Sequence, residues 1–236
     1  MMLRLLSVDF LKIKRKGLWF LVVLGPVGVV ALQMVNYGVR KDYLLQQSEN
    51  DWQYYMLNIM TFTPLAIVLG IVILTSFMAS IENETNAWKQ LIALPVSKLS
   101  VYLSKFTVIT FLLFISSILL MIFTLCYGMT LGLGESIPYL GLLKYSFFPF
   151  LAALPVLALQ LWFATVSNNQ AIPVTIGVIG VIFAYSAFVL PDWMIWKWPA
   201  LMNEWDKPVV NVILGVGFGF LLYLIGMFDF KRRDVK

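Results

Sequence analysis

Hydrophobic positions gather into six long stretches of the chain that contain no Asp, Glu, Lys or Arg. A transmembrane helix needs about 20 mostly apolar residues, because the hydrocarbon core is about 30 Å thick and each helical residue rises about 1.5 Å. Each stretch is therefore long enough to cross a bilayer without burying a charge. The six predicted spans are residues 18–37, 59–80, 106–131, 147–166, 171–191 and 209–228.

Residues 1–16 precede the spans and follow a different pattern. Leu3, Leu6, Phe10 and Ile13 fall on one helical stripe, whereas the basic side chains fall elsewhere. This pattern is typical of an amphipathic helix at a lipid surface, although a plain basic topology anchor fits as well. A full-length span follows the charges with no small-residue cleavage site, so the segment does not have the form of a signal peptide and should be retained.

The composition narrows the function classes. Of the 236 residues, 61% are hydrophobic and 12% are charged, against about 45–50% and about 25% in soluble domains. With no His and a single Cys, Cys126, the chain cannot form a His/Cys zinc site, a Ser-His-Asp or Cys-His nucleophile, or a disulfide framework. Cys126 itself is expected to be a buried packing residue. The sequence predicts an all-α polytopic membrane protein without enzymatic activity, catalytic residues or metal ligands.

The placement of charge predicts the orientation. Segments on the same side of the membrane as the N-terminus hold 12 of the 17 Lys and Arg residues, and the side richer in these residues normally stays cytoplasmic. Both termini are therefore predicted to be cytoplasmic. The net charge of +5 is then a topology signal and does not indicate a nucleic-acid partner. No span contains a carboxylate or His, which disfavours coupling to a proton or ion gradient.

The last span carries Gly215 and Gly219, four residues apart. This GxxxG spacing lets two helix backbones approach closely. The sequence leaves open whether the partner helix belongs to the same chain or to another protomer. A dinucleotide-binding loop is excluded, because these glycines lie within a span and follow no strand.

The longest predicted cytoplasmic connection joins the second and third spans. Trp88, Leu91 and Ile92 share one face of a short helix, with Glu84 and Asn86 as polar residues at its start and a proline at its end. Such an amphipathic helix would lie parallel to the membrane or dock in the groove of a partner. A simple interfacial linker is the alternative.

Residues 82–105 carry the most specific pattern, E-x-x-x-N-x-W-K-x-L-x-x-L-P-V-S-K followed by Lys105 before the third span. With the order of the spans, this pattern resembles the permease subunits of ABC-2 type transporters, particularly the short six-span permeases of lantibiotic immunity and of bacteriocin export. Members of that group usually carry Gly at the place of Asn86. The resemblance implies a single transmembrane permease domain over residues 1–236.

The resemblance also implies the roles of two segments. Residues 1–16 would be a connecting helix, and residues 82–94 a coupling helix that docks into an ATP-binding cassette ATPase subunit. The chain lacks a G-x-x-x-x-G-K-[ST] phosphate loop, so it would bind no cofactor directly, and ATP and Mg²⁺ would be bound by that partner. A second copy or a related permease would complete the transporter. The candidate coupling residues are Glu82, Glu84, Asn86, Trp88, Lys89, Leu91, Ile92 and Leu94.

The external connection between the last two spans holds four of the eight Trp residues, Trp193, Trp196, Trp198 and Trp205. Aromatic rings of this kind prefer the headgroup level, so an aromatic belt is one interpretation. The family resemblance favours another, in which Trp193, Trp196 and Trp198 belong to a re-entrant or interfacial lid at the substrate exit.

The uncharged spans favour a hydrophobic or amphipathic substrate over a hydrophilic one. Together with the resemblance, they predict the export of an antimicrobial or signalling peptide through a multi-pass protein of the bacterial cytoplasmic membrane. Its partners would be ATPase subunits, a second permease, membrane lipid and the peptide. A non-transporting scaffold or sensor subunit that recruits a cytoplasmic partner is the rival hypothesis.

Overall fold

The computed structural model describes residues 2–15, 17–48, 50–84, 97–134, 136–167 and 169–232. All regular elements in these ranges are helices, which confirms the all-α prediction for the part of the chain that is described. The elements are α1 (Met2–Arg15), α2 (Leu18–Leu45), α3 (Asp51–Glu84), α5 (Lys98–Leu131), α6 (Tyr139–Ala152), α7 (Leu154–Val166), α8 (Ala171–Tyr185), η1 (Ala187–Val189), η2 (Trp198–Ala200) and α9 (Pro208–Arg232).

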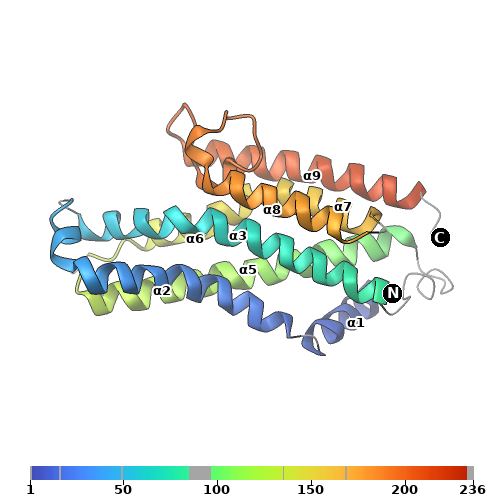
Figure 1. Cartoon of the computed structure of the whole chain (residues 1–236), viewed down its shortest axis with the longest axis horizontal. Helices are drawn as coiled ribbons and strands as arrows, with labels where there is room; N and C mark the ends of the chain where they lie inside the picture. The colour runs from blue at the N-terminus through green and yellow to red at the C-terminus, as the bar shows by residue number, and fades with distance from the viewer. Residues whose placement is uncertain are drawn as a thin grey trace.

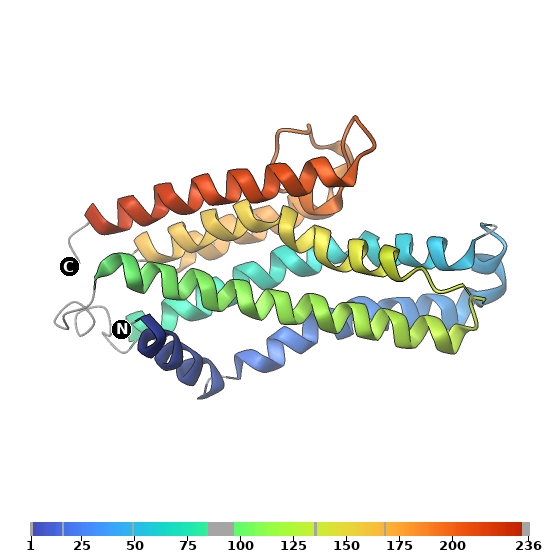
Figure 2. The ribbon, with the colours of Figure 1, turned by 180° about the vertical axis from the view of Figure 1, so that it is seen from behind.

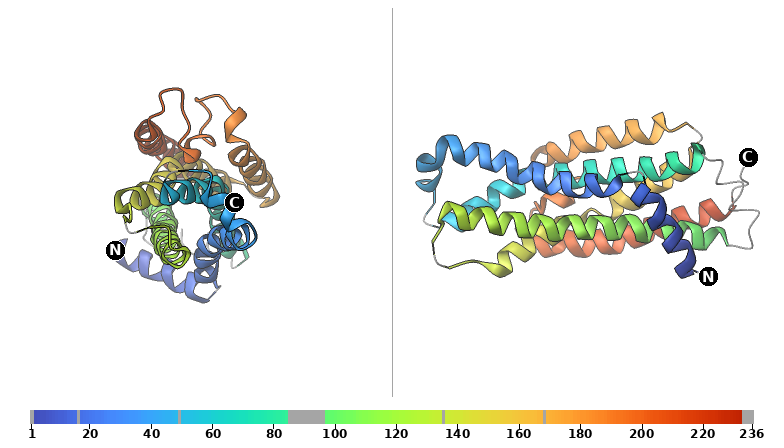
Figure 3. Two further views of the ribbon diagram at one scale, coloured as in Figure 1. Left: turned by 90° about the vertical axis from the view of Figure 1, so that its left-hand side faces the viewer. Right: turned by 90° about the horizontal axis from the view of Figure 1, so that it is seen from below.

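The helices run along one long axis and form an elongated bundle (Figures 1 and 2). One end of the bundle, called the terminus end below, holds α1, the end of α3, the start of α5 and the end of α9. The turn between α2 and α3 lies at the opposite end, called the far end. Helix α1 runs obliquely to the long axis against the other helices (Figure 3).

Five helical segments in the described ranges are long and apolar enough to cross a membrane: α2, the first 31 residues of α3, α5, α6 with α7, and α9. The chain is therefore a multi-pass membrane protein. The predicted fifth span, 171–191, differs from the structure, because α8 ends at Tyr185 after 15 residues. Such a helix rises about 22 Å, less than the hydrocarbon thickness. Pro191 favours the extended conformation of Leu190, where the short helix η1 ends.

The helices differ in length by more than the hydropathy pattern indicates. Helices α3 and α5 each have 34 residues and therefore rise about 51 Å. The connection between α8 and α9 lies beside the middle of α3, whereas α2, α3, α5 and α6 continue toward the far end (Figure 1). The predicted spans 59–80 and 106–131 thus mark only the apolar parts of two longer helices.

The interior divides into two hydrophobic clusters. One joins α1, α3, α5, α7 and α9 and includes Ile13, Ile71, Ile109, Leu157 and Tyr223. The other lies in the far half and is rich in aromatic residues, with Tyr37 and Trp52 both in edge contact with Tyr55. The Tyr55 hydroxyl donates a hydrogen bond to the carbonyl oxygen of Thr124 at 3.2 Å. This second cluster holds α2, α3 and α5 together beyond the start of α9.

Two sequence expectations about apolar side chains are modified by the packing. The stripe of α1 faces protein, because Ile13 is fully buried and Phe10 makes an edge contact with Phe111 of α5 at 5.4 Å between ring centroids. Cys126 is exposed on α5, so its prediction as a buried packing residue is wrong. Apolar character alone does not separate the protein-facing side of a membrane helix from the lipid-facing side, because both are hydrophobic.

Candidate functional sites

At the terminus end, α1 is attached to α5 by a buried polar contact. The Ser104 hydroxyl donates a hydrogen bond to Oδ2 of Asp9 at 2.6 Å, and the two residues are only 1% and 7% exposed. The ammonium group of Lys12 lies 4.0 Å from Oδ1 of the same carboxylate. A buried carboxylate is costly unless it is hydrogen-bonded or paired. The contact therefore fixes α1 at one position on α5, and sequence analysis missed it.

The candidate coupling segment lies mostly outside the described residues. Glu82 and Glu84 belong to the last turn of α3, and the remaining six candidates, Asn86, Trp88, Lys89, Leu91, Ile92 and Leu94, fall within the undescribed residues 85–96. Helix α5 begins with a regular cap, in which the Ser97 hydroxyl accepts the Ser100 N–H at 3.1 Å. The segment therefore connects two helix ends that lie beside α1, and the coupling helix stays a prediction.

The Trp-rich connection between α8 and α9 is an ordered loop built around an ion pair. Nζ of Lys197 lies 2.6 Å from Oδ1 of Asp192 and donates to the Leu190 carbonyl oxygen at 2.7 Å. Oδ2 of Asp192 accepts the Glu204 N–H at 2.8 Å. The hydrogen bond from Lys197 and then the one from Glu204 hold the pKa of the Asp192 carboxyl below its usual range. One carboxylate thus joins both halves of the loop.

A second set of hydrogen bonds joins this loop to α9. The buried side chain of Asn211 donates to the carbonyl oxygens of Trp198 and Met202, at 3.3 Å each, and accepts a hydrogen bond from Asn203. Leu201 adopts a left-handed conformation with φ 58°. The loop is therefore tied to the first turn of the last helix.

The predicted lid residues occupy different environments in the loop. Trp198 is buried, makes an edge contact with Phe218 of α9, and donates its indole N–H to the Asp192 carbonyl oxygen at 2.7 Å. Trp196 packs against α8 at Phe183 and Gly180. Trp193 is 76% exposed, and Trp205 is also exposed. Two of the four Trp residues therefore belong to the folded interior, and the other two face outward.

Gly215 and Gly219 lie against the junction of α6 and α7 within the same chain. A Cβ atom on Gly215 would lie 2.5 Å from Cα of Ala152, and one on Gly219 would lie 2.8 Å from Cβ of Leu154. Either distance is shorter than a normal carbon–carbon contact. The sequence left open whether the helix that packs on these glycines belongs to the same chain or to another protomer. In the structure it belongs to the same chain.

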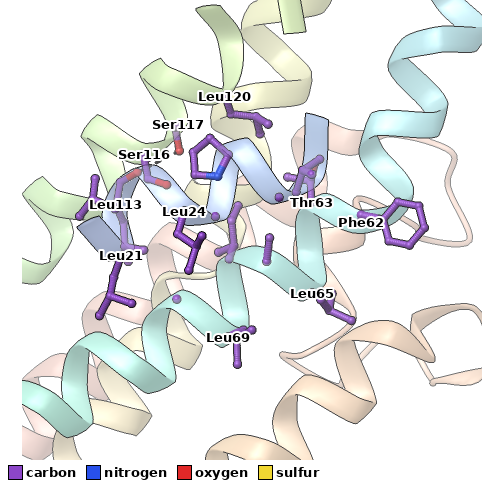
Figure 4. Close-up of a pocket in the computed structure, with 18 of the residues that line it drawn as sticks. Leu21, Leu24, Phe62, Thr63, Leu65, Leu69, Leu113, Ser116, Ser117 and Leu120 are labelled. Atoms are coloured by element: carbon purple, nitrogen blue, oxygen red, sulfur yellow. Dashed lines mark hydrogen bonds between the residues drawn. The ribbon is translucent and has the colours of Figure 1, made fainter. Parts of the chain in front are cut away.

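A cavity of about 480 Å³ lies between α2, α3 and α5 (Figure 4). No charged residue lines it in the part of the chain that the structure describes. Two lining hydroxyls are satisfied within their own helices, because Thr63 donates to Ile59 and Ser117 donates to Leu113. Its apolar lining includes Leu21 and Leu24 from α2, Leu65 and Leu69 from α3, and Leu113 and Leu120 from α5.

A chain of polar side chains follows α2 from this cavity toward the far end. The Gln33 amide donates to the Asn58 carbonyl oxygen of α3 at 2.9 Å, and the Asn36 amide donates to Gln33 at 3.3 Å. The Arg40 guanidinium donates to the Asn36 side-chain oxygen at 2.6 Å. The spacing of three to four residues on α2 is the sequence signal from which this shared face could have been predicted.

Comparison with known proteins identifies a family. The family model described as "ABC-2 family transporter protein" matches residues 5–184. This range covers about three quarters of the chain, from α1 to nearly the end of α8. No curated protein and no solved structure matches the chain. Across the described residues, His, Cys, Asp and Glu form no group of three or more that could hold a metal ion.

Proposed function

Because the chain belongs to the ABC-2 family of transporter proteins, we propose that it is the permease of an exporter for a hydrophobic or amphipathic peptide with antimicrobial or signalling activity. Family membership makes the chain the transmembrane component of an ABC transporter, with the ATPase on separate subunits. The direction of transport and the peptide are the proposed parts.

The observation that carries the proposed mechanism is the attachment of α1 to α5 at the terminus end. The α1 contact through Asp9 and Ser104 lies on the first turns of α5, just after the candidate coupling segment. In the proposed mechanism the ATPase binds residues 82–94, and ATP hydrolysis moves this segment together with α3, α5 and α1. Coupling of this kind needs two states of the permease with different partner contacts.

The proposed substrate class rests on the helices that would surround it. The membrane-crossing helices present apolar side chains on their exposed faces, such as Leu24, Ile213 and Phe220. A hydrophilic solute would find no charged group within the uncharged central parts of these helices, residues 18–37, 59–80, 106–131, 147–166 and 209–228, with which to exchange its hydration. A peptide already inserted in the bilayer fits such a surface, and we propose that it is expelled outward.

The loop between α8 and α9 has a proposed role at the exit. Its ion pair and its hydrogen bonds to α9 support a fixed shape, with Trp193 presented to the outer headgroup region. In this proposal Trp193, Trp196 and Trp198 border the exit, both chain termini are cytoplasmic, and the protein lies in the bacterial cytoplasmic membrane. A second copy or a related permease forms the other half of the transporter.

The test is peptide-stimulated ATP hydrolysis by the permease reconstituted with its ATPase. Trp88→Ala and Glu82→Ala should reduce the stimulation while the complex still assembles. Trp205→Ala and Glu204→Ala are matched controls, because both residues are exposed on the α8–α9 loop. Wild-type stimulation in both coupling variants would overturn the coupling assignment. An ATPase that binds the chain but drives no peptide transport would favour the scaffold hypothesis.

A further inference from the structure

The cavity between α2, α3 and α5 is suited to an apolar chain. Its volume of about 480 Å³ falls in the lower part of the range of small-molecule sites, which measure about 300–1,000 Å³. Of the three lining hydroxyls, those of Thr63 and Ser117 are used within their own helices and Ser116 is the third, so the lining offers few groups to a polar ligand. A folded α-helix, about 10–12 Å across with its side chains, is a poor match for this space.

The cavity opens beside side chains that face the surroundings of the bundle. Leu24 and Leu32 of α2 and Leu69 of α3 line it and are exposed. In a membrane-crossing bundle the surroundings at this depth are lipid chains. A lipid chain can therefore enter from the side without crossing a polar barrier.

Helix α2 carries a cation, Arg40, beyond the last of its residues that line the cavity, at a kink where the backbone leaves helical geometry. Arg40 lies five residues beyond Val35, the last lining residue of α2, which is about 7.5 Å along the helix. Its guanidinium is bonded to the neutral amide of Asn36, and no carboxylate of the described residues lies within 4.0 Å of it, although Asp42 is close in sequence. Lys41 adds a second positive charge. The apolar cavity is thus followed on α2 by two cations, Arg40 and Lys41, whose side chains make no ion pair with a carboxylate in the described part of the chain.

We propose that this cavity binds one acyl chain of an anionic membrane lipid, whose phosphate is held by Arg40 and Asn36. A guanidinium suits this role, because its planar donors match two phosphate oxygens. An acyl chain that enters the cavity comes from a surrounding of other lipid chains, so the hydrophobic effect contributes little to binding. The favourable term is the dispersion energy gained when the chain fills the void. Selectivity between different lipids therefore comes from the contacts with the headgroup. This proposal is independent of the transported substrate.

The test uses the purified chain in non-ionic detergent and native mass spectrometry. Phosphatidylglycerol and phosphatidylcholine with identical acyl chains are added in turn. Wild-type protein should retain one phosphatidylglycerol per chain and prefer it by about tenfold, the step expected from one hydrogen bond between charged groups. Arg40→Gln should abolish this preference. Lys144→Gln, an exposed cation near the start of α6, should keep it.

A second pair of variants tests the cavity itself. Gly28 lines the cavity, and a Cβ atom there would meet nothing within 4 Å. Gly28→Leu adds an apolar side chain at the wall of the cavity with no clash at its Cβ atom, and it should reduce the retention of both lipids by about tenfold. Gly217→Leu is the matched control, because a Cβ atom on Gly217 of α9 also meets nothing within 4 Å.

Four outcomes would overturn the proposal. They are equal retention of both lipids by the wild type, wild-type retention by Gly28→Leu, displacement of both lipids by detergent alone, and displacement of phosphatidylglycerol by an uncharged apolar peptide. The last outcome would assign the cavity to a peptide. Because the measurement needs neither ATPase nor transport, a failed transport assay would leave the lipid site standing, and failure of the lipid site would leave the permease assignment intact.

Discussion

Replacing Gly215 by Ala should strongly weaken the packing of α9 on the junction of α6 and α7. The added methyl carbon would lie 2.5 Å from Cα of Ala152 and 2.8 Å from the carbonyl oxygen of Leu151. Carbon atoms in favourable contact lie about 3.5–4.0 Å apart, so α9 must move away by about 1 Å. Both obstructing atoms belong to the backbone, and no side-chain rotation can relieve the clash.

The loss of stability depends on how much of the interface between α9 and the α6–α7 junction must separate. Gly219 and Gly226 lie on the same side of α9 and are close to Leu154 and Trp162, respectively. A radial gap of about 0.5–1 Å forfeits a quarter to a half of the dispersion energy of each contact. Overpacking typically costs about 1–3 kcal/mol, and the rigid backbone places this substitution in the upper half of that range. For a chain of this size, Tm should fall by roughly 4–12 °C.

Gly217→Ala supplies the control within the same helix, because a Cβ atom there meets nothing within 4 Å. Alanine has the better helix propensity, by up to about 1 kcal/mol, so Tm should stay the same or rise by about 2–4 °C. Thermal unfolding of the detergent-solubilised variants gives the comparison. If Gly215→Ala proves as stable as Gly217→Ala, then these two helices do not pack in the way described.

Two further predictions concern buried or paired carboxylates. Ser104→Ala should destabilise the protein by about 1–3 kcal/mol, because the Asp9 carboxylate loses its hydrogen bond in a buried site; an unchanged Tm in thermal unfolding would contradict this. The lowered pKa of Asp192 contributes stability that is present above the ordinary carboxyl pKa and is lost as the pH falls through the folded value. Tryptophan fluorescence should therefore report loosening of the loop only below pH 3.8, the ordinary value, and Lys197→Met should move the onset toward that value. An identical pH profile in that variant would rule out the ion pair as the cause.

Two features of the protein follow from its amino-acid sequence alone: the chain crosses a membrane, and its elements are helices. In a bilayer, a helix satisfies its own backbone hydrogen bonds, so a long apolar stretch is sufficient to predict a membrane-crossing helix. The stretches at 18–37, 59–80, 106–131 and 209–228 each lie within a long helix of the structure. The excess of Lys and Arg on one side likewise predicts that both termini are cytoplasmic. This orientation stays a prediction.

Features that depend on which side chains meet became visible only in the packed helices. The hydropathy pattern did not reveal that α8 ends at Tyr185, that Asp9 is buried against Ser104, or that Trp193 and Trp198 differ in exposure. Lipid-facing and protein-facing positions are equally apolar in a membrane helix, so composition does not specify the partner of a given face. The partner of Gly215 and the cavity between α2, α3 and α5 were settled by the relative placement of helices distant in sequence, because a contact or a void is a property of at least two packed surfaces.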